Sequence, residues 1–431
     1  MDVLIICFRK VVYIMKKVVF ITTRAIYPLT GGREVVLYNY CKGLKEMFDC
    51  EVNLISFIDD KNYNLTPKFI NKQYIVEQPV RLEKVCNIII KSIFSKMWPL
   101  QVSVYYSKST QMYISKIVNK INPDILICDM ARTAEYIRNI SDFKGKKVLD
   151  MDDLLSKRYY RQARNLNSSS NIFGQYEKKI PVFLKKFFSG KVVGKKILKI
   201  EAELLKKYEI RICNDFDSII FVSPIEAAEL NKNIKINKAF YVTIGVDYNY
   251  YSKAVSNNKN KNLIGFLGNM CVPHNRDAVD YFLKDIFPLV KNEVPDSKFR
   301  IIGKCSKEYK DKFKDIKHIE VTGEVDDIRK YVQECEVIVA PLLYGSGIKT
   351  KILESMAMGV PVVTNNIGAE GIKAKDNVDI LIRNDKIDFS KGIIKLLQDG
   401  NFKNFIISNS KKTIKEKYVW EKTLNNFKTI M

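Results

Sequence analysis

Short apolar runs alternate with longer helical patterns along most of this chain. In the first half, runs of aliphatic and β-branched residues occupy 17–22, 51–57, 124–129, 146–151 and 218–223. In the second half, comparable runs occur in LIGFLG, KFRIIG, HIEVTG, EVIVAPL and VPVVTN. Because these runs are continuously apolar, each predicts a strand buried on both faces. Strands of this kind separated by helices predict parallel α/β sheets.

The two series of runs are separated by a polar segment without periodicity, residues 251–262. We interpret this segment as a linker between an N-terminal domain, 16–250, and a C-terminal domain, 263–410. Both domains are expected to be doubly wound and Rossmann-like, so the fold class is α/β. A ligand cleft is then expected where the carboxyl ends of the strands of the two domains face each other.

The stretch YGSGIKTKILESMAMG follows one predicted strand and contains unusual chemistry. Gly345 and Gly347 allow a ligand to approach the backbone, and the start of the following helix offers free N–H groups and a positive dipole end. Lys349 and Lys351 add positive charge, while Glu354 has two acceptor oxygens suited to a ribose diol. This pattern predicts a binding site for a nucleoside diphosphate. The alternative is a solvated first turn that carries a Lys351–Glu354 surface pair.

Two stretches of the N-terminal domain are further candidates. The loop Gly31-Gly32-Arg33 precedes a predicted helix, so it favours a phosphate or acceptor contact, or else an ordinary strand-to-helix turn. In LDMDD, Asp152 and Asp153 either contact substrate hydroxyls or cap the helix that follows, and we favour the cap. Ser223, Pro224 and Glu226 predict a capping box at the start of another helix.

The inventory of residues excludes several classes of site. The nine cysteines are scattered without paired spacing, and only two histidines, His274 and His318, are present. We therefore expect neither disulfides nor a metal site, and a cytoplasmic location. The first 15 residues are too short and too broken by Arg9 and Lys10 to span a bilayer, so we interpret them as a tail or a misassigned start.

The net charge of +24 has two possible explanations: an anionic partner, or a lysine-rich composition without functional meaning. Residues 178–199 carry eight lysines and no acid, interleaved with Phe183, Phe187 and Phe188. Residues 85–98, VCNIIIKSIFSKMW, repeat the combination. Lysines beside bulky apolar residues favour peripheral contact with an anionic membrane at its cytoplasmic face. A solvated lysine face remains open, and nucleic-acid binding is the competing interpretation, although no recognised nucleic-acid module accompanies the lysines.

The ordered motifs of the second half resemble a known family. FLGNM, HNRDAVDYF, FRIIG, VTGEVDDIRKYV and VIVAPLLYGSGIKTKILESMAMGVPVV are similar to the C-terminal domain of the family-four, or group 1, retaining glycosyltransferases of the GT-B fold. The close similarity covers about residues 263–372, and the N-terminal half resembles the family more loosely. The last segment, 411–431 with Trp420, resembles the helix that crosses back to the first domain in that fold.

The resemblance implies a role for each matching residue. Gly345, Ser346, Gly347, Lys349 and Lys351 would embrace the donor diphosphate, and Glu354 would hold the ribose. Gly268 and Asn269 would flank the phosphates, and Thr322, Gly323 and Glu324 would line the base. His274 and Asn275 open a predicted helix in the cleft-facing first loop, where they either contact the donor or form a plain helix cap. Two departures put the donor-sugar contacts in doubt. Ser346 stands where many relatives carry a glutamate, and NMCVPHN replaces a familiar Arg/Lys pair.

Taken together, the residues and the resemblance predict a hexosyltransferase, and the resemblance alone implies retention of configuration. It would move a sugar from a nucleoside-diphosphate sugar to a hydroxyl of a glycan or polyprenyl-linked acceptor, without a bound cofactor, in the synthesis of a surface polysaccharide. Lys349, Lys351, Asp152 and Asp153 are the candidate catalytic residues. A nucleotide-sugar 2-epimerase on the same fold and a non-enzymatic nucleotide- or nucleic-acid-binding protein remain as alternatives.

Overall fold

The structure is a computed structural model of the whole chain, and it describes residues 15–29, 31–60, 63–164, 191–256 and 260–431. Residues 1–14 of the predicted tail lie outside the described residues. The same holds for residues 178–190 of the lysine-rich segment, which include Lys185 and Lys186.

The N-terminal domain is built on a parallel sheet that has seven strands among the described residues, in the order β3-β2-β1-β4-β5-β6-β7. The strands are β1 Lys17–Thr22, β2 Glu51–Phe57, β3 Lys72–Val76, β4 Ile125–Asp129, β5 Lys146–Asp152, β6 Ser218–Phe221 and β7 Ala239–Tyr241. All neighbouring pairs are parallel. The central strands bury nearly every side chain, as expected for a sheet with helices on both faces.

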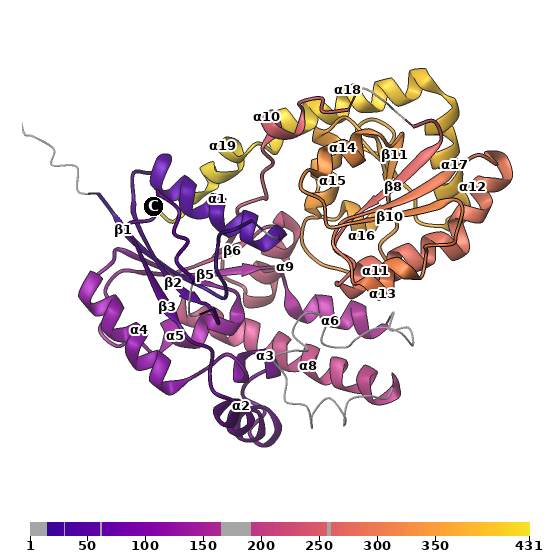
Figure 1. Cartoon of the computed structure of the whole chain (residues 1–431). Helices are drawn as coiled ribbons and strands as arrows, with labels where there is room; N and C mark the ends of the chain where they lie inside the picture. The colour runs from indigo at the N-terminus through magenta and orange to yellow at the C-terminus, as the bar shows by residue number, and fades with distance from the viewer. Residues whose placement is uncertain (1–14, 30, 61–62, 165–190, 257–259) are drawn as a thin grey trace, which may run out of the picture.

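The helices of this domain pack on both faces and along one edge of the sheet (Figure 1). They are α1 Gly32–Glu46, α2 Arg81–Asn87, the π-helix η1 Ile88–Phe94, α3 Leu100–Ser103, α4 Lys108–Ile121, η2 Ala131–Thr133, α5 Ala134–Arg138, α6 Leu155–Arg164, α8 Lys191–Ile212, η4 Cys213–Asp215, α9 Pro224–Ile234 and α10 Tyr248–Tyr251.

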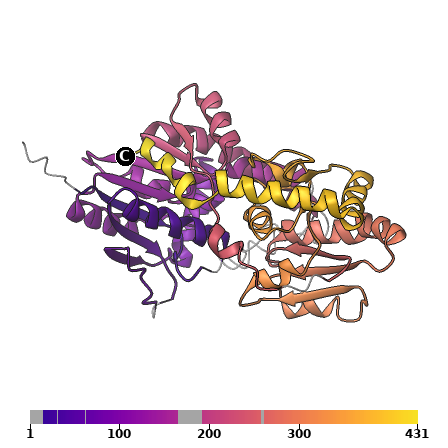
Figure 2. The same ribbon diagram turned by 90° about the horizontal axis from the view of Figure 1, so that it is seen from above.

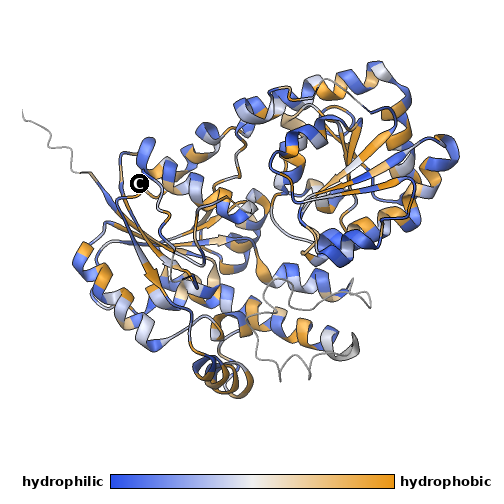
Figure 3. Cartoon of the chain, viewed as in Figure 1, coloured by the Kyte–Doolittle hydropathy of each residue, from blue (hydrophilic) through white to orange (hydrophobic). Residues whose placement is uncertain are grey.

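The C-terminal domain repeats the architecture with six described strands in the order β10-β9-β8-β11-β12-β13. The strands are β8 Leu263–Leu267, β9 Lys298–Ile302, β10 Ile319–Gly323, β11 Val337–Ala340, β12 Val362–Thr364 and β13 Leu381–Ile382. The helices are α11 Pro273–Tyr281, η5 Phe282–Ile286, α12 Phe287–Glu293, α13 Lys307–Asp311, α14 Ile328–Gln333, α15 Thr350–Ala357, α16 Asn366–Ala369 and α17 Lys386–Gln398. Figure 3 shows the strands of both sheets largely in the hydrophobic colour. Two doubly wound parallel sheets confirm the predicted fold class.

The end of the chain returns to the first domain. Helix α18 Gly400–Lys417 is followed by α19 Trp420–Thr423 and η6 Leu424–Thr429, and Figure 2 shows them running from one domain to the other. The ring of Phe427 packs edge-on against that of Tyr40, with 5.0 Å between the centroids. A Cβ atom at Gly245 would lie 2.5 Å from the Trp420 ring, so only glycine admits this tryptophan. The return therefore fixes the C-terminal segment onto the N-terminal core.

Helix α6 of the N-terminal domain makes a second connection between the domains. Arg161 donates from Nη1 to the carbonyl oxygen of Gly345 at 2.6 Å and from Nη2 to Glu370 Oε1 at 2.9 Å. Lys157 Nζ lies 3.1 Å from Glu370 Oε1. Arg158 Nε donates to Ser346 Oγ at 2.9 Å. These contacts hold the loop before α15 against the first domain.

Reversing the charge at Arg161 should open this connection. In Arg161→Glu, two carboxylates face each other, so we expect a larger radius of gyration in small-angle scattering. Combining it with Glu370→Arg should restore the wild-type value, with a coupling free energy of unfolding of about 1 kcal/mol. The matched control reverses the exposed Lys304–Glu324 pair, which lies within one domain. A radius of gyration unchanged by Arg161→Glu would contradict the assignment.

Candidate active site

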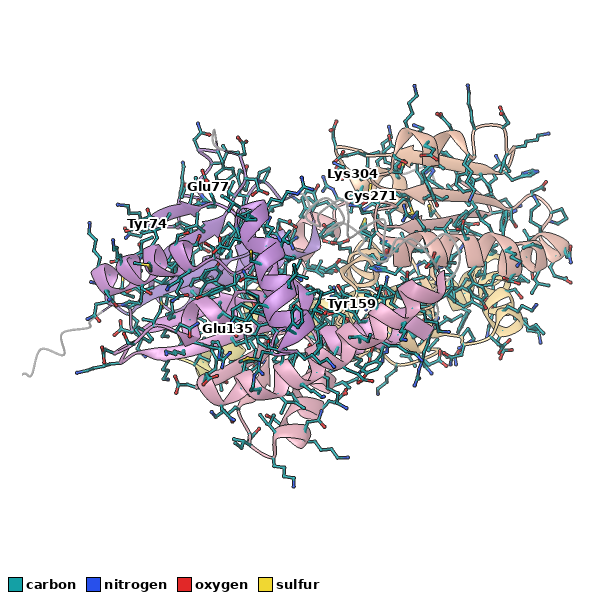
Figure 4. The ribbon with its side chains drawn as sticks, turned by 90° about the horizontal axis from the view of Figure 1, so that it is seen from below. Tyr74, Glu77, Glu135, Tyr159, Cys271 and Lys304 are labelled. Carbon is teal, nitrogen blue, oxygen red and sulfur yellow. The ribbon has the colours of Figure 1, made fainter. Side chains whose placement is uncertain are left out.

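A cleft of about 780 Å³ lies between the two domains, where the carboxyl ends of their strands meet. The N-terminal domain lines it with Gly31 to Arg33 and with α6 and the residues before it. The C-terminal domain lines it with residues around Gly268 and His274 and with the loop and first turns of α15. In Figure 4, Tyr159 lies between the domains, with Cys271 and Lys304 on the side of the C-terminal domain.

The loop between β11 and α15 has the backbone that its glycines predict. Gly345 has φ +153° and Gly347 has φ +65°, a left-handed region where side chains are disfavoured. Helix α15 begins at Thr350, with Lys349 as its N-cap residue and no side-chain cap, and Gly359 follows its end with φ +71°. The first backbone N–H groups of this buried helix therefore face the cleft without a side-chain cap.

Both lysines of this helix start are held inside the cleft wall. Lys349 is only 8% exposed, and its Nζ donates to the carbonyl oxygens of Ser346 at 2.5 Å and Gly347 at 2.7 Å. Lys351 Nζ donates to Asn275 Oδ1 at 2.5 Å and lies 4.5 Å from the centre of the Phe266 ring. Burial and the nearby Arg158 lower the pKa of Lys349 to about 8. Burial and Lys349 lower the pKa of Lys351 to about 7.

Glu354 lies one turn further along α15 and accepts from the Tyr251 hydroxyl at 3.4 Å. Burial raises the pKa of this carboxyl group to about 7. Lys351 therefore contacts Asn275 and Glu354 contacts Tyr251, which contradicts the alternative of an exposed Lys351–Glu354 surface pair. Burial thus lowers the pKa of Lys349 and Lys351 and raises the pKa of Glu354. Such shifts are typical of a site that binds a charged ligand.

The first loop of the C-terminal domain joins this group. Asn275 Nδ2 donates to the carbonyl oxygen of Asn269 at 2.8 Å. A Cβ atom at Gly268 would lie 3.0 Å from both Asn275 Nδ2 and Lys351 Nζ, so a side chain there would crowd this pair. Burial, followed by the charges of Lys351, Lys349 and Arg158, holds the pKa of His274 well below its usual range. His274 is therefore a neutral ring in a positively charged wall.

Thr322 and Gly323 differ from the other predicted donor contacts. Thr322 Oγ1 accepts from the backbone N–H of Gly303 at 3.3 Å and donates to the carbonyl oxygen of Gly323. At this place the cleft is lined by Glu324, Val325 and Asp326. Thr322 and Gly323 thus stabilise the turn at Gly303, while residues 324–326 line the cleft.

The N-terminal glycine loop faces the same point from the opposite side. Helix α1 begins at Gly32 with Gly31 as N-cap residue and no side-chain cap. A Cβ atom at Gly32 would lie 3.7 Å from Thr350 Oγ1, in the first turn of α15. The positive ends of two helices, one from each domain, therefore meet across the cleft.

The side chain of Arg33, in contrast, turns into the N-terminal domain. It donates to Asp129 Oδ1 at 2.6 Å, Asp150 Oδ2 at 2.7 Å and Asp152 Oδ1 at 3.0 Å. Burial, opposed by Arg33, raises the pKa of Asp150 to about 7. Burial also acts on Asp129, but Arg33, Arg24 and Thr23 outweigh it and lower the pKa of that carboxyl. The guanidinium is thus occupied by carboxylates, and the loop can offer a phosphate its backbone N–H groups.

The predicted cap of α6 is wrong, whereas that of α9 is right in position but lacks the predicted hydrogen bonds. Leu154 N donates to Glu226 Oε1, and Ser156 donates from N and Oγ to Glu209, so distant glutamates cap α6 in place of Asp152 or Asp153. Ser223 does precede Pro224 at the start of α9, but its side chain makes no cap hydrogen bond. Glu226 cannot complete a capping box because its carboxylate is turned toward α6.

Asp152 and Asp153 have different environments. Asp152 binds Arg33 from a backbone with φ +65°, an uncommon conformation for a residue other than glycine. Asp153 is 2% exposed, and its Oδ2 contacts Arg158 and Ser346. Within the described residues, its Oδ1 is buried without a hydrogen-bond partner. Both aspartates line the cleft, and Asp153 retains a free acceptor atom there.

Sequence reasoning missed Asp129, Asp150, Arg158, Arg161 and Tyr251. Part of the signal was present, because Asp129 and Asp150 lie at the carboxyl ends of adjacent predicted strands, the edge where parallel sheets bind ligands. Arg158 and Arg161 are three residues apart on a helix and so share one face. Nothing local marks Tyr251, whose partner Glu354 is distant in sequence.

Residues 261–399 match the family model described as "Glycosyl transferases group 1". This part of the C-terminal domain is a group 1 glycosyltransferase domain. The whole chain is 24% identical to an uncharacterised 44.6 kDa protein in the cps region of Klebsiella pneumoniae, over 96% of this chain and 99% of that protein.

A second relative is an α-1,4-N-acetyl-D-galactosaminyltransferase of Campylobacter jejuni whose name gives an undecaprenol-diphosphate-linked acceptor. It is 30% identical over 36% of this chain and 44% of its own length. Among solved structures, Staphylococcus aureus TarM in complex with UDP, fondaparinux and α-GlcNAc-glycerol superposes with a TM-score of 0.67 at 15% identity. The superposition covers 96% of this chain and 99% of TarM, and it shows a shared GT-B fold.

Replacing the lysines and the glutamate of α15 should separate their roles. If Lys349 and Lys351 contact a diphosphate, Lys349→Ala or Lys351→Ala removes a charged contact worth about 1.5 to 3 kcal/mol, roughly a ten- to hundredfold loss in transfer efficiency. Part of this loss should appear in turnover, because phosphate charge grows as the sugar departs. Glu354→Ala should mainly weaken nucleotide binding, and Glu354→Gln should retain part of it. Wild-type affinity and rate in three folded variants would contradict the assignment.

The lowered pKa values also predict a pH dependence of nucleotide affinity. A bound diphosphate favours charged Lys349 and Lys351, whose pKa values are about 8 and about 7 without ligand. Binding above pH 7 must therefore take up protons, and affinity should fall by at least about tenfold between pH 7 and pH 9. Calorimetry on Glu354→Gln measures this without the opposite titration of the carboxyl group. Adding Lys351→Ala should make the profile less steep, because only Lys349 then titrates in this range. A flat profile in Glu354→Gln itself would refute the prediction.

Proposed function

We propose that this glycosyltransferase transfers a hexosyl group, with retention of configuration, from a nucleoside-diphosphate sugar to a hydroxyl of a glycan or lipid-linked acceptor. One observation carries the proposal: two uncapped helix starts, buried Lys349 and half-buried Lys351 converge on one point of the cleft between the domains. A diphosphate has the charge and the oxygen atoms to satisfy such a convergence. A nucleoside diphosphate is also the leaving group of the proposed reaction.

In this proposal, the diphosphate lies against residues 345–351 and the N-terminus of α1. Glu354 accepts hydrogen bonds from the ribose, and the base extends toward residues 324–326. Gly268, Asn269 and Asn275 flank the phosphates. As the bond between the sugar and the diphosphate breaks, Lys349, Lys351 and the helix dipoles stabilise the growing negative charge.

The acceptor enters from the side of the N-terminal domain in this proposal. Asp153 supports this direction, because its unpartnered Oδ1 can accept a hydrogen bond from a hydroxyl on the acceptor or on the transferred sugar. Asp152 is more exposed than Asp153, but its Oδ1 already accepts a hydrogen bond from Arg33. The chemistry needs both substrates held together with water excluded, and the contacts of α6 with the second domain serve that purpose.

We further propose a polyprenyl-linked acceptor and a role in surface polysaccharide synthesis. The cps-region relative and the undecaprenol-linked acceptor named for the Campylobacter relative support it. So does the lysine-rich segment, of which Lys195 and Lys196 are described and exposed at the start of α8. Within the described residues, no helix is both long and apolar enough to cross a bilayer. Contact with a membrane through these residues would therefore be peripheral.

Screening nucleotide sugars tests this function. We expect one family among UDP-, GDP- and ADP-sugars to raise the melting temperature of the protein, and the matching donor to lose its sugar to an added glycan or polyprenyl-linked acceptor. Glu354→Gln serves as the control, because it should reduce the stabilisation without unfolding the chain.

The products of that screen separate the alternatives. Conversion of the donor to a 2-epimer without any acceptor would favour the epimerase. Salt-sensitive binding of oligonucleotides with no donor turnover would favour a nucleic-acid-binding protein. Either result would replace the proposed function.

A further inference from the structure

The segment 80–97 exposes an unusual number of large apolar side chains. It comprises α2, η1 and the residues beside them, and it projects from the N-terminal domain as the lowest feature of Figure 1. Figure 3 shows hydrophobic colour on its outer side. The exposed fractions are 68% for Val80, 74% for Leu82, 41% for Ile89, 56% for Ile90, 55% for Ile93, 79% for Phe94 and 48% for Met97. We call these seven residues the apolar face.

The helix is attached to the domain mainly through polar groups. Asn87 Nδ2 donates to the carbonyl oxygen of Tyr106 at 2.8 Å, and Ser92 Oγ lies 2.7 Å from Ser103 Oγ. Ile88 is buried beside them, and Lys91 Nζ lies over the Trp98 ring. A surface helix normally turns its apolar side to the core and its polar side to water. This segment does the reverse, so its apolar face needs a covering partner.

Positive charge surrounds the apolar face. The segment contains Arg81, Lys84, Lys91 and Lys96, with Glu83 as its one acidic residue. Glu83 accepts from the backbone N–H of Lys108, at the N-terminus of α4, so its charge is directed toward the domain. Apolar side chains among cations fit a surface that offers both hydrocarbon and negative charge.

The apolar face continues into the wall of the active-site cleft. Buried Trp98 and Pro99 follow Met97 directly and lead into α3. Gln101 of α3 lines the cleft and donates from Nε2 to the Tyr159 hydroxyl at 2.6 Å. Glu201 of α8 accepts from the backbone N–H groups of Leu100 and Gln101 and so fixes this junction. A partner on the apolar face therefore lies next to the acceptor side of the cleft.

We propose that residues 80–97 dock the enzyme onto a bilayer that carries anionic headgroups, with the apolar face inserted among the lipid chains. This inference deepens the proposed function, on which its biological purpose rests, because it places the cleft beside a membrane-bound acceptor. A second copy of this chain fits the face less well, since a symmetric contact would bring the cations of one segment against those of the other. An anionic bilayer satisfies both the charge and the apolar side chains.

Vesicle flotation with the full chain tests the docking surface. The probes are vesicles of phosphatidylcholine alone and vesicles containing one third phosphatidylglycerol. We expect binding to the anionic vesicles that weakens with salt. Ile90→Ser/Ile93→Ser/Phe94→Ser should reduce it about tenfold or more. The matched control is Ile316→Ser/Ile387→Ser/Phe405→Ser, whose side chains are 45%, 52% and 50% exposed on the other domain and should leave vesicle binding unchanged.

A second pair of variants tests the charges. Arg81→Gln/Lys96→Gln should weaken binding to anionic vesicles about tenfold at low salt. Lys391→Gln/Lys415→Gln, which removes two exposed lysines of the C-terminal domain, should not. Thermal stabilisation by UDP, measured on every variant, reports on the fold and the donor site. Vesicle binding without any effect of UDP would leave the docking surface standing and count against UDP as the donor nucleotide.

Several outcomes would overturn the inference. Wild-type protein that does not float with anionic vesicles would do so, as would equal flotation of the apolar-face variant and the wild type. A dimer in sedimentation that is lost in the apolar-face variant, with no vesicle binding by either, would assign the face to a second copy of this chain.

Discussion

The architecture of the site depends on the meeting of two positive helix ends across the cleft. The starts of α1 and α15 come from different domains, and the close approach of Gly32 to Thr350 brings them together. Neither start is capped by a side chain, so both dipoles act on the same small volume. Buried Lys349 and half-buried Lys351 lie there as well, and their lowered pKa values reflect that crowding. An anion is the simplest group that relieves all of these positive charges together.

Carboxylates around the cleft compensate part of this positive charge. Asp129, Asp150 and Asp152 all bind Arg33, so the charge of this cleft-lining residue is already paired. Glu370 of the second domain binds Lys157 and Arg161 of α6, so this acidic residue connects the two domains. Each pair lies at the rim or behind the wall of the cleft. The charges of α15 itself are left for the ligand.

The sequence predicted what depends on local pattern. The central strands, such as 17–22 and 51–57, were identified because continuous apolar runs are buried on both faces. The edge strands β3, β7 and β13 were missed, since they are short or half-exposed and carry a weaker signal. The glycine loop and the helix start of α15 were recognised from spacing. Pairs formed by folding, such as Glu209 with Ser156, cannot be read from neighbours in sequence.

In the proposed reaction, the segment 80–103 would bring the two substrates to the cleft from opposite sides. Its first part carries the apolar face and its last part, through Gln101, forms wall of the cleft, with Trp98 and Pro99 buried between them. Because this stretch is short and fixed by Glu201, the distance from a docked bilayer to the cleft cannot vary much. A lipid-linked hydroxyl would then reach the N-terminal wall from the membrane, while a water-soluble nucleotide sugar reaches α15 from the other domain. In this proposed arrangement, the fold would keep a hydrophobic and a highly charged substrate apart until both are held in the same cleft.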